Sequence, residues 1–131
     1  MTEGPQKKIL IVEDEEIVRI IVNDYLKMAN YSSYESETTE EALELIKKEK
    51  FDLAIVDINM PGISGEEFML SAKKISPDIK FLIHTGSDHY KVSENLKKIG
   101  LSQEAVLFKP VEDMQVFKTT IENILSKKIK G

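Results

Sequence analysis

The chain has 131 residues and a formal net charge of −5 at neutral pH. This length suits a single domain, and the acidic balance argues against a nucleic-acid partner, because such proteins usually present a basic face. The sequence contains no cysteine, which excludes disulfides and thiolate metal sites, and its apolar runs are far shorter than the roughly 20 residues of a membrane span. We therefore expect a cytoplasmic protein that binds neither nucleic acid nor membrane.

Four short apolar runs predict buried strands, at residues 9–12, 53–56, 81–83 and 105–108. The runs are continuous and do not alternate with polar residues, which favours strands covered on both faces, as in parallel sheets. A weaker run of tyrosines and serines over residues 31–36 suits a half-exposed edge strand.

Apolar residues at helical spacing follow each strand and predict five amphipathic helices. Their expected inner faces are Ile17, Ile21, Tyr25 and Met28; Ala42, Leu45 and Ile46; Phe68, Ala72 and Ile75; Val92, Leu96 and Ile99; and Met114, Phe117, Ile121, Ile124 and Leu125. Thr38 and Ser64, each with a glutamate three residues later, predict helix starts, and Gly100 predicts a helix end. The last helix is expected to end in the lysines of residues 127–130, where the helix dipole favours cations. Strand and helix alternate five times, which predicts an α/β fold whose parallel sheet has helices on both faces.

Polar residues directly follow the four strong strands: Glu13 and Asp14, then Asp57, Thr85 and Lys109. The carboxyl ends of parallel strands meet at one edge of the sheet, so these side chains should lie together. Carboxylates ~4 Å apart repel by roughly 4 kcal/mol at an effective dielectric constant of ~20, and one lysine cannot neutralise three acids. Either an acid is protonated or a cation is bound, and the oxygen ligands suit Mg²⁺. Mg²⁺ suits phosphoryl transfer, in which an aspartate can be the covalent acceptor.

The order and spacing of four segments resemble the receiver domain of bacterial two-component response regulators. The segments are Val12-Glu13-Asp14-Glu15, residues 56–62 with Gly65, Thr85-Gly86, and Lys109-Pro110. The resemblance covers residues 8–128. It implies a flavodoxin-like, five-stranded parallel sheet of order 2-1-3-4-5, with a flexible lead-in over residues 1–7 and a short tail over 129–131.

The resemblance also implies a role for each matching position. Asp57 would accept the phosphoryl group, and Asp14 and Asp57 would bind Mg²⁺ (or Mn²⁺) directly. Glu13 would reach the ion mainly through water, and Asn59 would reach it through its backbone carbonyl.

Two further positions complete the implied site. Lys109 would pair with Asp57 and then with the phosphoryl oxygens, and the Lys109–Pro110 peptide would be cis. Thr85 would turn its hydroxyl toward the phosphoryl group. The phosphoryl donor would be a histidine kinase or a histidine phosphotransfer protein, and the chain would catalyse only its own phosphorylation and dephosphorylation. A downstream effector or an output domain would receive the signal, and a homodimer could form through the fourth helix, fifth strand and fifth helix.

The sequence departs from the family pattern where an aromatic switch residue is usual, three positions before the lysine. Val106 occupies that position, and Phe108 is expected to be a fixed core residue on the same side of the strand. The segment over residues 100–105 is also longer than in compact family members. We therefore expect the response to phosphorylation in the loop after Thr85 and in a fourth helix over residues 88–99.

Three other functions remain open from the residues. A haloacid-dehalogenase-like phosphatase also uses a strand-end aspartate and Mg²⁺, but needs an acid where this chain has Asn59. A flavodoxin-like nucleotide binder would have glycine and serine in place of the acids of residues 13–16. A receiver-like interaction scaffold would never be phosphorylated. Considered singly, Glu15 is expected to form a turn or helix cap, His84 to pack at a strand end, and His89 to lie in a solvated loop.

Overall fold

The structure is a computed structural model that describes residues 6–131, so most of the predicted lead-in lies outside the described residues. Five strands form one parallel sheet in the order β2-β1-β3-β4-β5, as predicted. The strands are β1 (Lys8–Val12), β2 (Ser32–Ser36), β3 (Leu53–Val56), β4 (Lys80–Thr85) and β5 (Val106–Phe108). The helices are α1 (Glu16–Met28), α2 (Thr39–Lys48), α3 (Gly65–Ile75), α4 (Glu94–Lys98) and α5 (Gln115–Leu125), with a short 3₁₀ turn, η1, at Gln103–Ala105.

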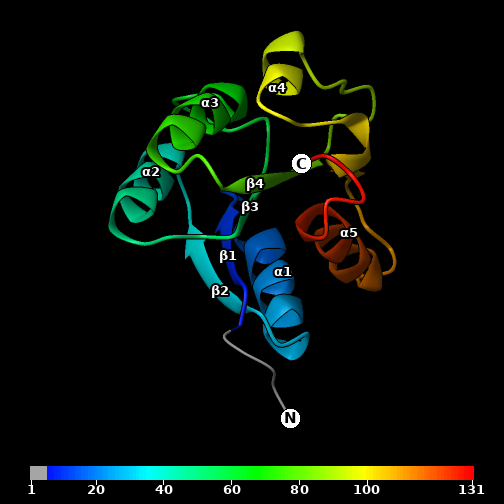
Figure 1. The fold of residues 1–131 in the computed structure, drawn as a ribbon. Helices are drawn as coiled ribbons and strands as arrows, with labels where there is room; N and C mark the ends of the chain where they lie inside the picture. The colour runs from blue at the N-terminus through cyan, green and yellow to red at the C-terminus, as the bar shows by residue number, and fades with distance from the viewer. Residues whose placement is uncertain (1–5) are drawn as a thin grey trace.

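Helices cover both faces of the sheet: α1 and α5 lie on one side, and α2, α3 and α4 lie on the other (Figure 1). Successive strand residues point to opposite faces, so Ile9 and Ile11 join the core beneath α1 and α5, while Leu10 and Val12 join the core beneath the other helices. Both faces are buried, which explains why the central strands are continuously apolar.

Three predicted helix boundaries are confirmed. The hydroxyls of Thr38 and Ser64 accept hydrogen bonds from the backbone amides three residues later, at 3.0 and 3.1 Å. Gly100 follows the end of α4 with a positive φ of 107°, a conformation that glycine adopts without a steric penalty. The last boundary differs from prediction, because α5 ends at Leu125 and the lysines of residues 127–130 follow the helix.

The predicted inner face of α1 is wrong at three of its four positions. Ile17, Ile21 and Met28 are 70%, 51% and 84% exposed, and only Tyr25 packs against the core. The helix instead buries Arg19, Val22, Asn23 and Leu26. Among residues 6–131, an exposed apolar stripe therefore runs along α1.

Hydrogen bonds to β2 and its following loop explain why α1 is rotated this way. The guanidinium of Arg19 donates to Glu35 and Glu37 at 3.1 and 3.2 Å and to the backbone carbonyl of Glu13 at 3.0 Å. Asn23 donates to Glu35 at 2.8 Å. Burial of a charged arginine is costly unless it is paired. These contacts supply the pairing and hold Arg19 on the inner face of α1. The spacing of apolar residues alone does not reveal such a contact.

The fourth helix is shorter than predicted, because only residues 94–98 are helical. The side chain of Gln103 binds the backbone of residues 90–92, which are not helical. Its amide donates to the carbonyl of Tyr90, and its oxygen accepts from the amide of Val92, both at 2.9 Å. Ser93 then caps α4 by accepting from the amide of Leu96 at 3.2 Å. The extra length of the 100–105 segment thus supplies a clamp for residues 90–92.

The fifth strand also differs from expectation at its end. Val106 is buried, but Phe108 is 38% exposed and is not a fixed core residue. β5 is an edge strand that pairs only with β4, and Phe108 is its last residue, so the ring lies at the rim of the sheet. His89 lies in an exposed loop, as expected. Within residues 6–131, no helix combines the length and apolar character that crossing a bilayer requires.

Candidate functional site

Three acids meet at the carboxyl ends of β1 and β3, as the sheet order predicts. Val12 pairs with Val56 at the ends of these neighbouring strands, so Glu13, Asp14 and Asp57 emerge side by side. One carboxylate oxygen from each lies within 4.8 Å of the others. Glu13 and Asp57 are buried and Asp14 is exposed, so the cluster is anchored inside and open to solvent on one side.

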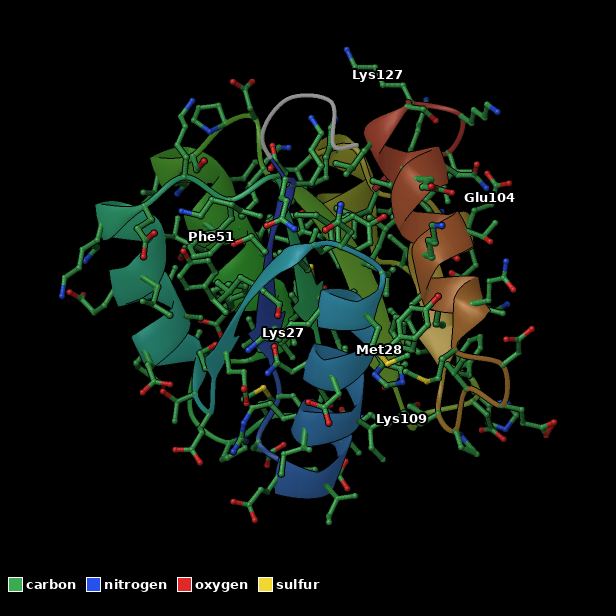
Figure 2. All side chains as sticks on the ribbon, turned by 90° about the horizontal axis from the view of Figure 1, so that it is seen from below. Lys27, Met28, Phe51, Glu104, Lys109 and Lys127 are labelled. Atoms are coloured by element: carbon green, nitrogen blue, oxygen red, sulfur yellow. The ribbon has the colours of Figure 1, made fainter. Side chains whose placement is uncertain are left out.

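Lys109 supplies the only ammonium among the described contacts of this cluster. Its Nζ lies 2.9 Å from Glu13, 2.8 Å from Glu15 and 3.3 Å from Asp57. Burial alone would lower the pKa of Lys109, but the hydrogen bonds to Glu15 and Glu13 and the attraction of Asp57 outweigh it and raise the pKa. Figure 2 shows Lys109 between α1 and the segment that leads to α5. Lys109 is half-buried and has the acid partners that its position predicts.

Glu15 is a site contact that the sequence reasoning missed. It occupies the N-cap position of α1, yet its side chain makes no cap hydrogen bond and instead pairs with Lys109. This contact lowers the pKa of the Glu15 carboxyl. Its position directly after two predicted site acids was the available signal.

The crowding of acids perturbs Glu13 most and favours its protonated form. Burial raises the pKa of Glu13 to about 7, a hydrogen bond from Lys109 opposes the rise, and the charge of Asp57 adds to it. One ammonium thus does not offset three nearby carboxylates, and a proton or a cation is needed to balance the buried pair.

The loop after β3 fixes the orientation of Asp57. The backbone amide of Asn59 donates to Oδ1 of Asp57 at 3.1 Å, while Lys109 approaches the other oxygen. A pocket of about 270 Å³ opens here, lined by Asp14, Glu15, Asp57, Asn59, Gly86 and Lys109. The pocket leaves the aspartate accessible, whereas the role of the Asn59 carbonyl as a metal ligand stays a prediction.

Thr85 lies at the edge of this site and points its hydroxyl elsewhere. It is fully buried, and its Oγ1 accepts a hydrogen bond from the amide of Ser87 at 3.1 Å. Its carbonyl accepts from the amide of Lys109 at 2.8 Å, and the Lys109–Pro110 peptide is cis, as predicted. The hydroxyl accepts this bond and keeps its own proton, so Thr85 remains a possible donor to a group on Asp57.

Gly65 lets α3 begin directly against the loop that carries Asp57. A Cβ at this position would lie 2.8 Å from the Cα of Ile58 and 2.9 Å from the carbonyl oxygen of Asp57. Both atoms belong to the backbone, so a side chain could not be accommodated by rotating a neighbour.

We predict that Gly65→Ala will displace the Asp57 loop, lower the free energy of unfolding by about 1–3 kcal/mol and slow phosphorylation by roughly tenfold or more. Chemical denaturation and the rate of labelling by acetyl phosphate would measure the two effects. Gly86→Ala is the matched control for the free energy of unfolding, because a Cβ there meets nothing within 4 Å. Equal behaviour of the two variants would contradict the close-approach argument.

Comparison with known proteins identifies the family. The family described as "Response regulator receiver domain" matches residues 9–127. Sporulation initiation phosphotransferase F of Bacillus subtilis is 30% identical over 94 residues, which cover 72% of this chain and 76% of that protein. A cyclic di-GMP phosphodiesterase of Thermotoga maritima is 30% identical over 121 residues, but this chain spans only 32% of its length.

Solved structures share the same fold. The response regulator protein TrrA of T. maritima, in complex with Mg²⁺-BeF, superimposes with a TM-score of 0.77 at 28% identity, covering 91% of this chain and 99% of that one. A structure of histidine kinase ThkA in complex with TrrA gives a TM-score of 0.78 at 29% identity, covering 92% and 99%. With the sheet order and the acidic pocket at β1 and β3, these matches show that the chain belongs to the response regulator receiver domain family.

Proposed function

We propose that the chain accepts a phosphoryl group on Asp57 from a phosphohistidine of a histidine kinase or a histidine phosphotransfer protein. A carboxylate oxygen of Asp57 attacks phosphorus, the P–N bond breaks, and the released imidazole takes up a proton. The observation that carries the proposal is the meeting of Asp57 with Asp14, Glu13 and Lys109 in one accessible pocket. The product is an aspartyl phosphate.

The same acids fit a divalent cation. Three hard oxygen ligands within 4.8 Å of one another suit Mg²⁺ or Mn²⁺, with Asp14 and Asp57 as direct ligands and Glu13 through water. A bound ion would neutralise charge on the transferred phosphoryl group. The family relationship to a receiver solved with Mg²⁺-BeF supports this choice.

Lys109 and Thr85 are the residues that would contact the phosphoryl oxygens. Lys109 already touches the Asp57 carboxylate, so its ammonium needs only a small rotation to follow the new oxygens. Thr85, whose hydroxyl only accepts a hydrogen bond from Ser87, would donate its own proton to a phosphoryl oxygen. Lys109 therefore stabilises the product charge, and Thr85 reports its presence.

In this proposal the chain is a switch that becomes phosphorylated on its own Asp57 and does not transform a separate substrate. A phosphatase would need an acid two residues after the nucleophile, and Asn59 instead uses its backbone amide to orient Asp57. An interaction scaffold would not require the half-buried ammonium of Lys109 to lie within 3.3 Å of three carboxylates, two of them buried.

Incubation with acetyl phosphate and Mg²⁺, followed by intact-mass analysis and peptide mapping, tests the proposal. We expect one phosphoryl group, on the peptide that contains Asp57. Sustained release of phosphate from many substrates would favour the phosphatase, and an unlabelled protein that still binds Mg²⁺ would favour the scaffold.

We further propose that the phosphoryl donor docks over the exposed stripe of α1. This helix begins directly after the site acids, and its outward residues Ile17, Ile20 and Ile21 are 70%, 45% and 51% exposed. A protein that places a histidine over Asp57 must cover this neighbouring surface. A related receiver has been solved in complex with a histidine kinase.

We predict that Ile21→Glu will slow phosphotransfer from a histidine kinase at least tenfold, because a buried unpaired charge would weaken docking. The donor is whichever enzyme labels the parent protein fastest in a panel of purified histidine kinases. Labelling by acetyl phosphate, which needs no docking, should remain unchanged. Ile75→Glu, on the exposed side of α3 and 39% exposed in the parent, is the matched control. Equal loss in both variants would contradict docking over α1.

Output is proposed to pass through the loop of residues 86–93, which joins Thr85 to α4. Val106 is too short and too stiff at χ1 to act as a rotating switch. The loop carries the Ser87 amide that donates to the Thr85 hydroxyl, and Gln103 holds its far end. A homodimer through α4, β5 and α5 stays a prediction.

We predict that Gln103→Ala will speed amide hydrogen exchange at Val92 by about tenfold, because each hydrogen bond contributes roughly 1 kcal/mol. It should also reduce the shift of residues 94–98 that beryllofluoride with Mg²⁺ produces in the parent, since the loop would no longer transmit strain to α4. Gln115→Ala, on the exposed first turn of α5, should change neither. If both variants respond like the parent, the clamp has no role in the relay.

A further inference from the structure

A groove separate from the acidic pocket lies between α3 and α4, on the face of the sheet away from α1 and α5 (Figure 1). Its volume is about 430 Å³, within the range of protein sites that bind small groups. It is lined by Leu70, Lys73, Lys74, Asn95, Lys98 and Ile99. The groove therefore combines two aliphatic side chains with three cations, and no acid lines it.

The aliphatic part of the groove is its floor. Leu70 and Ile99 are half-buried, and both pack against the core beneath α2, α3 and α4. The parts of these two side chains that remain exposed line the groove. Covering such a surface with an aliphatic side chain is favourable, because burial of a leucine side chain contributes about 1.5–3 kcal/mol when it is complete.

The three lysines around this floor carry charges that the chain does not neutralise. None of the ion pairs formed within residues 6–131 involves Lys73, Lys74 or Lys98. The half-buried Lys73 donates one hydrogen bond to the carbonyl of Ile79 at 2.6 Å, which leaves two of its three donors. Burial and the charge of Lys80 lower the pKa of Lys73. An incoming carboxylate would therefore find unpaired cations.

The position of these lysines at helix ends does not by itself explain the groove. Cations in the last turn of a helix offset its dipole, and Lys27 of α1 and Lys48 of α2 occupy the same kind of position. What is particular to α3 and α4 is that their lysines converge around an apolar floor. The whole chain carries a net charge of −5, so this groove differs in sign from the molecule that holds it.

We propose that the groove docks an acidic segment of a partner protein, which seats one aliphatic side chain on Leu70 and Ile99 and pairs the flanking carboxylates with the three lysines. The floor selects the aliphatic group, and the lysines select the sign of the charges beside it. The concave shape suits a peptide better than the flat surface of an anionic membrane. The docking goes beyond the proposed phosphoacceptor function, because none of the groove residues lines the acidic pocket.

Three blocked pentapeptides test the site without any knowledge of the partner. One has a central leucine between two pairs of glutamates, the second has glycine in place of the leucine, and the third has lysines in place of the glutamates. Titrations would be followed by the backbone amide shifts of Leu70, Asn95 and Ile99. We expect the leucine–glutamate peptide to bind saturably at low salt, with a dissociation constant on the order of 1 mM.

The two comparison peptides separate the floor from the rim. The glycine peptide should bind about tenfold more weakly, because it lacks the side chain that the floor would bury. The lysine peptide should not bind. Added salt should weaken the leucine–glutamate peptide by roughly threefold between ~20 and ~150 mM, because exposed charges are screened. If the glycine peptide binds as tightly as the leucine peptide, or if no peptide causes a saturable shift, the proposal is overturned.

Variants assign the contacts to the groove. Lys74→Gln and Lys98→Gln, at exposed positions, should each weaken the leucine–glutamate peptide by about threefold. Lys27→Gln removes the same charge from the exposed last turn of α1 and should leave the affinity unchanged. Equal loss in all three variants would show attraction by net charge alone and overturn the groove. Leu70→Asn should remove the preference for leucine over glycine, and thermal unfolding would verify that each variant is folded.

An anionic lipid surface is the alternative occupant, and co-sedimentation with phosphatidylglycerol vesicles tests it. We expect no binding to the vesicles at ~150 mM salt. Binding that Lys74→Gln and Lys98→Gln abolish together would assign this face to a membrane and overturn the peptide. Labelling of Asp57 by acetyl phosphate should be the same in these variants as in the parent. Failure of the peptide titrations would therefore leave the phosphoacceptor function standing, and failure of labelling would leave the groove to be judged by the titrations.

Discussion

Asp57→Asn should take up no phosphoryl group from acetyl phosphate in the presence of Mg²⁺. The amide keeps the shape of the side chain and its contact with the Asn59 backbone, but it lacks the nucleophilic carboxylate. Intact mass after incubation measures the loss, which should be complete within detection. A label that persists, or that maps to Glu13, Asp14 or a serine, would contradict the assignment of Asp57.

The same substitution should make the metal-free protein slightly more stable. Lys109 lies near three carboxylates, and removal of one negative charge relieves repulsion by on the order of 1 kcal/mol. Chemical denaturation in EDTA measures the change. Asp24→Asn, an exposed acid on α1, is the matched control and should alter neither labelling nor stability.

The sheet and the edge that carries the site could be predicted, because each strand and its end correspond to a short local pattern in the sequence. Each buried strand reads as a continuous apolar run, and each ends in the polar residue that forms the site, from Asp57 to Lys109. The strand order came from the family resemblance, and the register of Val12 with Val56 shows how it brings the acids together.

The contacts of single polar side chains could not be predicted in the same way. Arg19 points inward because Glu35 and Glu37 lie within reach on a different element. The four isoleucine and methionine residues of α1 are left exposed as a result, which their spacing alone does not predict. Gln103 forms hydrogen bonds with Val92 and Tyr90, which lie 11 and 13 residues earlier in the chain. These bonds occur where the sequence predicts the first turns of the fourth helix. Such partners are set by tertiary packing and leave no periodic signal.

His84 shows the same limit. Its burial at the end of β4 was predictable, but its edge-on contact with Phe117 of α5 depends on how that helix packs on the sheet. The ion pair of Glu15 with Lys109 joins residues 94 positions apart. The only sign of it in the sequence is that Glu15 follows the two acids after β1.

Mg²⁺ should bind about tenfold more weakly for each pH unit below 7, because Glu13 must lose its proton to contribute its charge. Burial raises the pKa of this carboxyl to about 7, and a metal site assembled from carboxylates competes with protons. Isothermal titration between pH 5 and 8 would measure the slope. Glu13→Gln, which cannot ionise, should bind Mg²⁺ weakly with a much flatter dependence on pH.

The free energy of unfolding of the metal-free protein should also depend on pH through the raised pKa of Glu13. The folded pKa of Glu13 lies above its ordinary value of 4.5, so between about pH 4.5 and 7 the folded state holds a proton that the unfolded state has lost. Stability due to Glu13 therefore falls as pH rises through this window, by ~1.4 kcal/mol per unit at most. His84 acts oppositely, because its lowered pKa makes stability rise between about pH 4 and 6.5.

The difference in unfolding free energy between the parent and Glu13→Gln separates these two contributions, since His84 is common to both proteins. In EDTA the unfolding free energy of the parent should fall relative to that of Glu13→Gln as pH rises from 5 to 7. Saturating Mg²⁺ should reverse that trend, because the ion replaces the proton as the partner of the ionised acid. A difference that is independent of pH in both conditions would mean that Glu13 is ionised throughout, with Lys109 alone sufficient to hold its charge.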